Sequence, residues 1–263
     1  MMNKSLVDEL LEDSELDQKI VKSFYSKESL SPDIFEEDNG SFSMKDNIRT
    51  KLLEIADKFV EFIGIDFFID DVHLTGSLSN FNWSEYSDVD LHILVDFNDF
   101  NDSNKKDSTS MKKIIKQFFD SKKNNWNSEH DIKIKGYDVE LYVQDSNEKH
   151  LSTGVYSILN NKWIIEPKKG KEFIDDRTIM EKGQEYAELI DSLVKSSESG
   201  KDVSKDVDDV KTKLKQFRQS GLEKGGEYSY ENLTFKLLRR NGYIEKLMGI
   251  KKGIQNKKLS VAQ

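Results

Sequence analysis

The chain has 263 residues, 36 % of them hydrophobic and 34 % charged, which is long enough for one generous domain or two modest ones with buried cores. The absence of cysteine excludes disulfides, thiolate zinc sites and thiol nucleophiles, and a formal net charge of −9 argues against a surface built to coat nucleic acid. No apolar run approaches the roughly 18 residues that cross a bilayer, and the acidic N-terminus is unlike a secretion signal, so we expect a cytoplasmic protein without a membrane partner.

The N-terminal part of the chain predicts a helix, a polar linker and a second helix. Apolar residues form a helical stripe over residues 4–25, whereas residues 26–45 are rich in serine, acidic residues and glycine. Asp46 is expected to cap the next helix, in which apolar residues recur at intervals of three and four over residues 47–63. Gly64 can then end that helix.

The middle of the chain predicts strands around one more helix. The segment "DVHLTGS" indicates a short strand that leads to a glycine, and apolar residues alternate with polar ones over residues 88–97, as in a strand with one buried face. After a polar loop, Ser110 is expected to cap a helix. Residues 131–145 alternate again, with Gly136 at the turn of a hairpin.

Beyond Pro167 the pattern is helical, and Ser229 is expected to cap a helix that ends at Asn241-Gly242. The order of elements indicates an α/β (α+β) core followed by a helical region. The expected organisation is an N-terminal helix and polar linker over residues 1–45, a core over 46–166 and a helical domain over 167–263.

Two aspartates on the second predicted strand indicate a cation site. Asp88 and Asp90 are separated by one residue, so both carboxylates are expected to leave the same face of the strand. Without a cation the two charges would repel each other. Mg²⁺ prefers hard oxygen ligands and usually keeps waters and substrate phosphates as its remaining ligands. The pair therefore predicts a metal site next to a phosphate.

The residues that follow the first predicted strand suit that phosphate. Gly76 lets the backbone come close to a ligand, and Ser77 adds a hydroxyl donor. A third carboxylate is expected from the neighbouring strand, where Glu140 is favoured and Asp138 is the alternative. Carboxylates that bridge two metals can activate an attacking hydroxyl and stabilise a leaving pyrophosphate, and Glu140 can accept the proton of that hydroxyl.

At these residues the sequence resembles the polymerase-beta-like nucleotidyltransferase superfamily, whose signature is a hydrophobic residue, Gly-Ser, a gap of about ten residues and then Asp-x-Asp. The signature stands here as Leu74-Thr75-Gly76-Ser77 and Asp88-Val89-Asp90-Leu91. The resemblance covers roughly residues 46–145. It implies a mixed sheet flanked by helices, Mg²⁺ or Mn²⁺, a nucleoside triphosphate donor such as ATP, and transfer of a nucleoside monophosphate to a hydroxyl with release of pyrophosphate.

Two blocks outside that signature, "GVYSILNNKWIIEP" and "GEYSYENLTFKLLRRNGYIEKL", are similar to uncharacterised nucleotidyltransferase-like proteins of large tailed bacteriophages. That similarity would place the protein in a host cytoplasm. The chain departs from the superfamily pattern in two places. It has "LSNFNW" where many small members carry Arg and Gly, and Glu140 stands where the third carboxylate is usually Asp. These departures favour the alternative of an inactive nucleotide-binding or structural module that retains the fold.

Several further residues have two interpretations. In the functional interpretation, Lys236 and Arg240, with Arg218, close over the triphosphate or contact the acceptor. In the structural interpretation, the cations complement the dipole of the helix that Ser229 caps. His92 either touches substrate or is a surface residue packed by its neighbours. The acceptor is left open between RNA, a protein side chain and a small molecule. The four histidines are scattered without metal-ligand spacing, so a zinc enzyme is not expected.

Overall fold

The computed structural model describes residues 15–100, 108–150, 152–169 and 174–260. It divides into two compact units. The sheet unit runs from Ser26 to Gly170. The helical unit consists of two segments, the chain up to Tyr25 and the chain from Lys171 onward. The region expected as one N-terminal part, residues 1–45, is thus divided between the two units after Tyr25. Of the helix expected over residues 4–25, residues 15–22 are helical, and the part before residue 15 lies outside the described residues.

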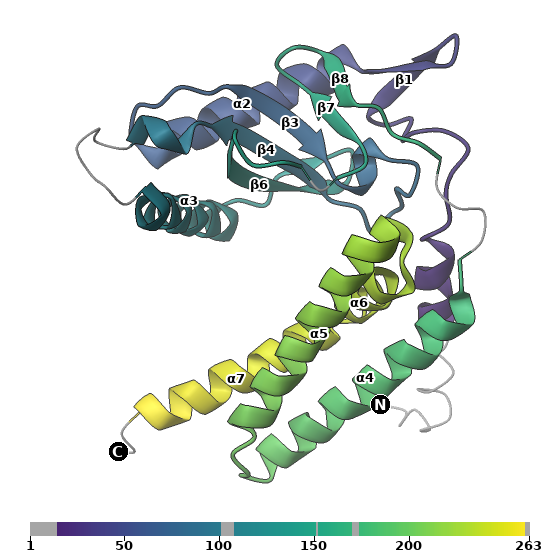
Figure 1. Ribbon diagram of the computed structural model, residues 1–263, viewed down its shortest axis with the longest axis vertical. Helices are drawn as coiled ribbons and strands as arrows, with labels where there is room; N and C mark the ends of the chain where they lie inside the picture. The colour runs from purple at the N-terminus through teal and green to yellow at the C-terminus, as the bar shows by residue number, and fades with distance from the viewer. Residues whose placement is uncertain (1–14, 101–107, 151, 170–173, 261–263) are drawn as a thin grey trace, which may run out of the picture. The chain divides into compact units, whose positions relative to one another are not determined.

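The sheet unit is a mixed α+β structure, as the sequence predicts at that coarse level (Figure 1). Its six-stranded sheet has the order β5-β6-β4-β3-β7-β8, in which β4 and β6 are parallel and the other neighbours antiparallel. The strands are β3 (Asp71–Thr75), β4 (Val89–Val95), β5 (Lys133–Ile134), β6 (Tyr137–Asp145), β7 (Val155–Ser157) and β8 (Lys162–Ile165). Helices α2 (Asp46–Ile63) and α3 (Ser108–Glu129) pack against the sheet.

The two faces of the central strand β4 have opposite character. Val89, Leu91 and Ile93 are fully buried, and they share one hydrophobic core with α2 and α3, which contribute side chains such as Leu52 and Phe119. Side chains alternate along a strand, so the residues between them face away from that core. The helices therefore cover the apolar face of the sheet, and the other face carries the polar residues of β4.

Some local expectations hold and others need correction. Gly64 ends α2 with a φ of 76°, and Gly136 lies at the β5–β6 turn with a φ of 91°. Asp46 is not the cap of α2, because Lys45 holds the N-cap position and Asp46 is the first helical residue, where its charge suits the helix dipole. Ser110 is not a cap either, since α3 begins two residues earlier at Ser108.

The polar segment expected to be a linker contains a hairpin. Strands β1 (Phe35–Asp38) and β2 (Ser41–Met44) pair antiparallel as a separate two-stranded sheet. Asn39 and Gly40 form the turn with φ values of 49° and 81°, the left-handed conformations that a tight two-residue hairpin needs. Only the outer ends of the hairpin are buried, at Phe35 and Met44.

The helical unit packs four long helices side by side (Figure 1). They are α4 (Asp176–Glu198), α5 (Ser204–Gly225), α6 (Tyr230–Arg240) and α7 (Tyr243–Leu259). Ser229 caps α6 as expected, because its hydroxyl accepts a hydrogen bond from the backbone N–H of Asn232 at 3.3 Å. Asn241 is the C-cap of α6, and Gly242 follows with a φ of 75°.

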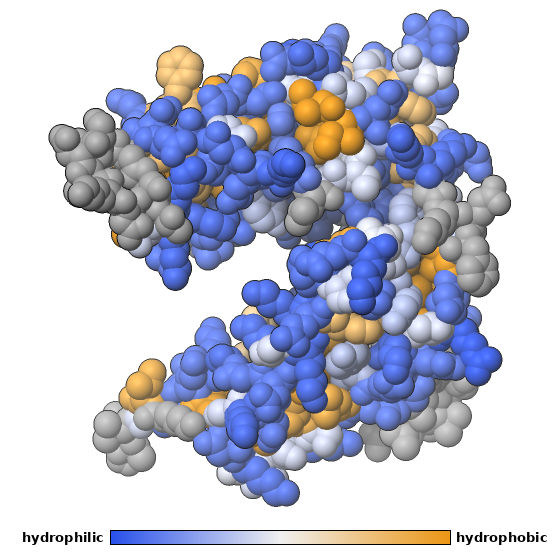
Figure 2. Space-filling view, in the orientation of Figure 1, coloured by the Kyte–Doolittle hydropathy of each residue, from blue (hydrophilic) through white to orange (hydrophobic). Residues whose placement is uncertain are grey.

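No helix in the described ranges is both long and apolar enough to cross a bilayer. Hydrophilic side chains dominate the face of the molecule that Figure 2 shows. This agrees with a chain of which about a third is charged.

Candidate functional site

The centre of the candidate site is a row of three residues across neighbouring strands. Asp90 on β4 is the register partner of Thr75 on antiparallel β3 and of Glu140 on parallel β6. Register partners point to the same face of a sheet, so the three side chains lie abreast on the polar face. We call the two acids of this set, Asp90 and Glu140, the carboxylate row, and Thr75 lies beside Asp90. Asp88 immediately precedes β4.

Gly76 brings the backbone against the Asp90 carboxylate. A Cβ at Gly76 would lie 1.8 Å from Asp90 Oδ2 and 2.8 Å from Asp90 Cγ, so no larger residue fits unless Asp90 moves. Gly76 also has a φ of 75°, a conformation that costs other residues free energy. The glycine of the Gly-Ser pair is therefore needed twice, once for its conformation and once for its contact with Asp90.

Ser77 begins a short 3₁₀ turn, Ser77–Ser79, and its hydroxyl lies in a network of serines. Ser77 Oγ donates to Ser87 Oγ at 2.8 Å, and Ser87 Oγ accepts from the backbone N–H of Ser84 at 2.9 Å. Ser84 and Ser87 are each only 5 % exposed. The loop between the Gly-Ser pair and β4 is thus held by buried hydrogen bonds, which the sequence did not reveal.

Glu140 is oriented by a tyrosine two residues further along β6. The Tyr142 hydroxyl donates a hydrogen bond to Glu140 Oε2. The Tyr142 ring is stacked on His92, with ring centroids 4.9 Å apart and planes at 22°, and Lys123 Nζ lies 4.4 Å from its centroid. His92 Nδ1 in turn lies 2.8 Å from Gln144 Oε1. Neighbours from β4 and α3 therefore fix the ring whose hydroxyl holds Glu140.

Of the two carboxylates considered for the third position, Glu140 lies beside Asp90. Asp138 is exposed and forms an ion pair with Lys133 across the β5–β6 hairpin. Strand alternation puts both residues on the same face of β6, and the register distinguishes them, because Glu140 is the partner of Asp90. The two residues differ in charge environment as well, because Asp138 already has a cationic partner.

Three of the four histidines meet on the polar face. His73 and His92 are register partners on β3 and β4, and His150 Nε2 lies 2.8 Å from His73 Nδ1. His73 Nε2 lies 3.0 Å from Asp71 Oδ2. Burial lowers the pKa of His92 to about 4 and also lowers the pKa of His150. The scattered spacing in the sequence gave no sign of this cluster, because the cross-strand register brings its members together.

The chemistry of the carboxylate row fits a hard divalent cation, since Asp90 and Glu140 offer oxygen ligands next to the position of Asp88. Within the described ranges, however, no three histidine or acidic side chains are already gathered closely enough to hold a metal ion. The carboxylate row therefore supplies suitable ligands that would have to draw together around a cation.

The two cations expected to bind nucleotide, Lys236 and Arg240, lie on α6 in the helical unit. Arg240 Nη1 donates to Ser23 Oγ at 2.7 Å, and its guanidinium carbon lies 4.9 Å from the Phe24 ring centroid. Burial lowers the pKa of Lys236, and neighbouring guanidinium groups, Arg240 first, lower it further. Arg240 thus has a packing role within its own unit, and nucleotide binding by these two residues stays a prediction.

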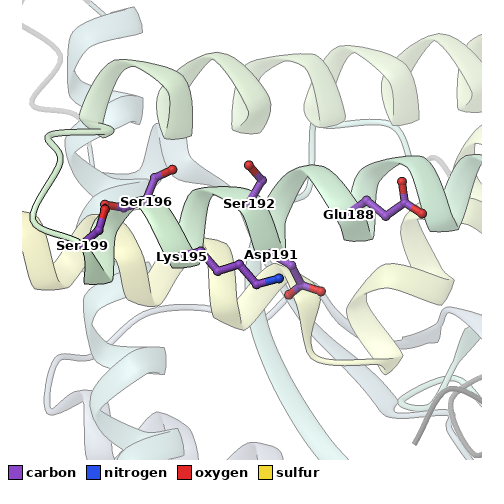
Figure 3. A pocket seen from close by; sticks show the side chains of 6 residues that line it. All are labelled: Glu188, Asp191, Ser192, Lys195, Ser196 and Ser199. Atoms are coloured by element: carbon purple, nitrogen blue, oxygen red, sulfur yellow. The ribbon is translucent and has the colours of Figure 1, made fainter. Parts of the chain in front are cut away.

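Two cavities in the helical unit contain none of the carboxylate row. One, of about 490 Å³, is an open groove along α4. Figure 3 shows its lining side chains, of which Glu188, Asp191, Ser192, Lys195 and Ser196 lie on α4 and Ser199 is the C-cap of that helix. The other, of about 470 Å³, is lined from α4, α6, α7 and residues 16–17.

Comparisons with protein-family models, with curated proteins and with solved structures find no match to this chain.

Proposed function

We propose that the protein is a metal-dependent nucleotidyltransferase that moves a nucleoside monophosphate from a nucleoside triphosphate to a hydroxyl acceptor and releases pyrophosphate. The observation that carries the proposal is the alignment of Asp90 with Glu140 on parallel neighbouring strands, with the Gly76 backbone packed against the Asp90 carboxylate. Carboxylates beside a glycine-containing turn are the combination that a metal-bound triphosphate requires.

Each candidate site residue has a separate role in the proposed reaction. Asp88, Asp90 and Glu140 would hold Mg²⁺ or Mn²⁺, which supplies positive charge near the transferred phosphoryl group. The backbone of the turn binds phosphate oxygens, and the Ser77 hydroxyl joins it when its proton turns from Ser87 Oγ toward the phosphate. Glu140 accepts the proton of the attacking hydroxyl. Phosphoryl transfer depends mainly on positioning and charge, so a rigid turn beside the carboxylates is the feature to expect.

The second candidate is an inactive module that keeps the fold and binds nucleotide without turnover. Two observations favour it. No three metal-ligating side chains are already gathered among the described residues. The third carboxylate is a glutamate whose Oε2 already accepts a hydrogen bond from Tyr142. The two candidates predict the same binding of nucleotide and differ in transfer.

A labelling experiment separates them. The purified protein is incubated with each α-phosphate-labelled nucleoside triphosphate, with Mg²⁺ or Mn²⁺ and with fractions of a bacterial lysate, and the Asp88→Asn/Asp90→Asn double variant is the control. The proposal expects label in RNA, protein or a small molecule with the parent alone. Metal-dependent nucleotide binding without transfer in any fraction supports the inactive module. Equal transfer by parent and double variant contradicts the assigned roles.

A further inference from the structure

The turn that contains Gly76 and Ser77 is held by a distant segment of the chain. Residues 152–154 lead directly into β7, which pairs with β3. From that segment, Thr153 Oγ1 donates to Asn80 Oδ1 at 2.9 Å, and the Gly154 carbonyl accepts from Ser79 Oγ at 2.8 Å. Ser79 and Asn80 are 0 % and 3 % exposed. The contact is therefore polar on both sides, with Ser79, Asn80 and Gly154 buried and Thr153 at the surface end of it.

Gly154 makes this close approach possible. A Cβ at this position would lie 2.1 Å from the Ser79 carbonyl oxygen and 2.9 Å from Asn80 Oδ1. Ser152 Oγ adds a second hydrogen bond to the Gly154 carbonyl at 2.8 Å. The segment is thus shaped to lie against the turn, and a side chain at residue 154 would push it away.

Asn80 transmits the contact to Gly76. Asn80 Nδ2 donates to the Gly76 carbonyl at 2.7 Å, and Ser79 Oγ lies 3.0 Å from the same oxygen. Only the amide nitrogen can donate to that carbonyl, and only the amide oxygen can accept from the Thr153 hydroxyl. Thr153 therefore fixes which end of the Asn80 amide faces Gly76.

Fixing the Gly76 carbonyl also fixes the next N–H group. A trans peptide is planar, and its C=O and N–H point in opposite directions. With the Gly76 oxygen held toward Asn80, the Ser77 N–H must point to the other side of the peptide. Backbone N–H groups held in this way are common ligands of phosphate oxygens.

We propose that Asn80 and Thr153 are positioning residues that hold the Gly76–Ser77 peptide ready for a triphosphate oxygen of the nucleotide. The inference rests on the proposed function, and in it neither residue contacts the nucleotide. Their effect is to order the turn before the ligand arrives, which removes part of the entropic cost of binding.

The test compares Thr153→Val, which removes the hydroxyl donor at similar volume, with Thr153→Ser, which keeps it. Thr178→Val is the matched control, because Thr178 Oγ1 donates to Asp175 Oδ2 at 2.7 Å in the helical unit. The dissociation constant of Mg²⁺ with α,β-methylene ATP, a non-hydrolysable analogue, is measured by calorimetry for each variant. The backbone N–H signal of Ser77 is followed by NMR.

We expect Thr153→Val to weaken analogue binding roughly three- to tenfold, the size of one lost hydrogen bond, and to move the Ser77 N–H signal. Thr153→Ser and Thr178→Val should stay within about twofold of the parent. Parent-like affinity of Thr153→Val, or equal weakening by Thr153→Ser, overturns the inference and leaves the proposed function standing. Absence of analogue binding by the parent overturns the proposed function and the inference together.

Discussion

The Asp90 carboxylate occupies the space where any residue other than glycine at position 76 would place its Cβ. The distance from that Cβ to Asp90 Oδ2 would be 1.8 Å, well inside van der Waals contact. The backbone of one strand end and the acid of the neighbouring strand are thus fitted to each other. Gly76 and Asp90 are 14 positions apart in the sequence, but each limits which residue the other position can hold.

We expect Gly76→Ala to destabilise the sheet unit by about 3 kcal/mol, because the left-handed φ costs about 1 to 2 kcal/mol and the clash adds a similar amount. Gly136→Ala is the matched control. It has a φ of 91°, but nothing lies within 4 Å of its would-be Cβ, so only the conformational cost applies. Urea unfolding of both variants measures the difference. Equal destabilisation would show that Asp90 yields without cost.

The choice between the two candidate third carboxylates gives a second prediction. Glu140→Gln should lower transfer on the order of 10²- to 10⁴-fold, because it removes both a metal ligand and the proposed proton acceptor. Asp138→Asn, on the same strand but exposed and paired with Lys133, should leave transfer within about twofold. Initial rates with labelled nucleotide decide between them. A larger loss from Asp138→Asn than from Glu140→Gln would instead assign the third carboxylate to Asp138.

Tyr142 should matter through Glu140. Tyr142→Phe keeps the ring that stacks on His92 and removes the hydroxyl that donates to Glu140, so we expect Mn²⁺ affinity to fall about tenfold with little loss of stability. Tyr25→Phe is the matched control, because Tyr25 also donates to a carboxylate, Asp176, at 2.9 Å in the helical unit. Mn²⁺ titration followed by electron paramagnetic resonance provides the measurement. Unchanged affinity would assign the Tyr142 hydroxyl to folding alone.

Strand periodicity was sufficient to predict the central strands and the face that carries Asp90. Alternation over β4 and β6 is strong, because one face of each strand is buried and the other is polar. The β1–β2 hairpin lacks that signal, since only Phe35 and Met44 at its outer ends are buried. The Asn39-Gly40 pair, a strong hairpin signal, could have revealed it.

The long-range hydrogen bonds around the site could not be predicted from the sequence, for a different reason. The contact of Thr153 with Asn80 joins residues 73 positions apart, and His73 meets His150 from 77 positions away. Such contacts depend on which strands become neighbours, here β3 and β7. Local periodicity predicts a strand and its faces but carries no information on its partner.

Arg240 is expected to contribute to stability whatever its role with nucleotide. Arg240→Ala removes the hydrogen bond to Ser23 and the contact with the Phe24 ring, so we expect a loss of about 1 to 2 kcal/mol in the helical unit. Arg239→Ala, at the exposed neighbouring position, should cost less than about 0.5 kcal/mol. Urea unfolding and analogue binding are measured on the same samples. Weakened binding with unchanged unfolding would instead favour the nucleotide contact.

The acid sensitivity of the sheet unit should depend on Asp145. Its side chain is only 4 % exposed and lies 2.7 Å from Lys112 Nζ. Burial alone would raise the pKa of Asp145, but hydrogen bonds from Lys112 and Asn147 outweigh it and the pKa is lowered. A lowered carboxyl pKa stabilises the folded state above the unfolded pKa, near 3.8, and that stability is lost as the pH falls through the folded pKa.

We therefore expect Asp145→Asn to lower the free energy of unfolding at pH 7 by about 1 to 3 kcal/mol and to weaken its fall below pH 4. Lys112→Met leaves the carboxylate buried without its cation and removes the largest of the hydrogen bonds that lower its pKa, so the pKa of Asp145 rises from its value in the parent. Its acid unfolding midpoint should move to higher pH than that of the parent. Unfolding free energies measured from pH 7 to pH 2 test both variants. Parallel curves for parent and Asp145→Asn would mean that other carboxylates set the acid limit.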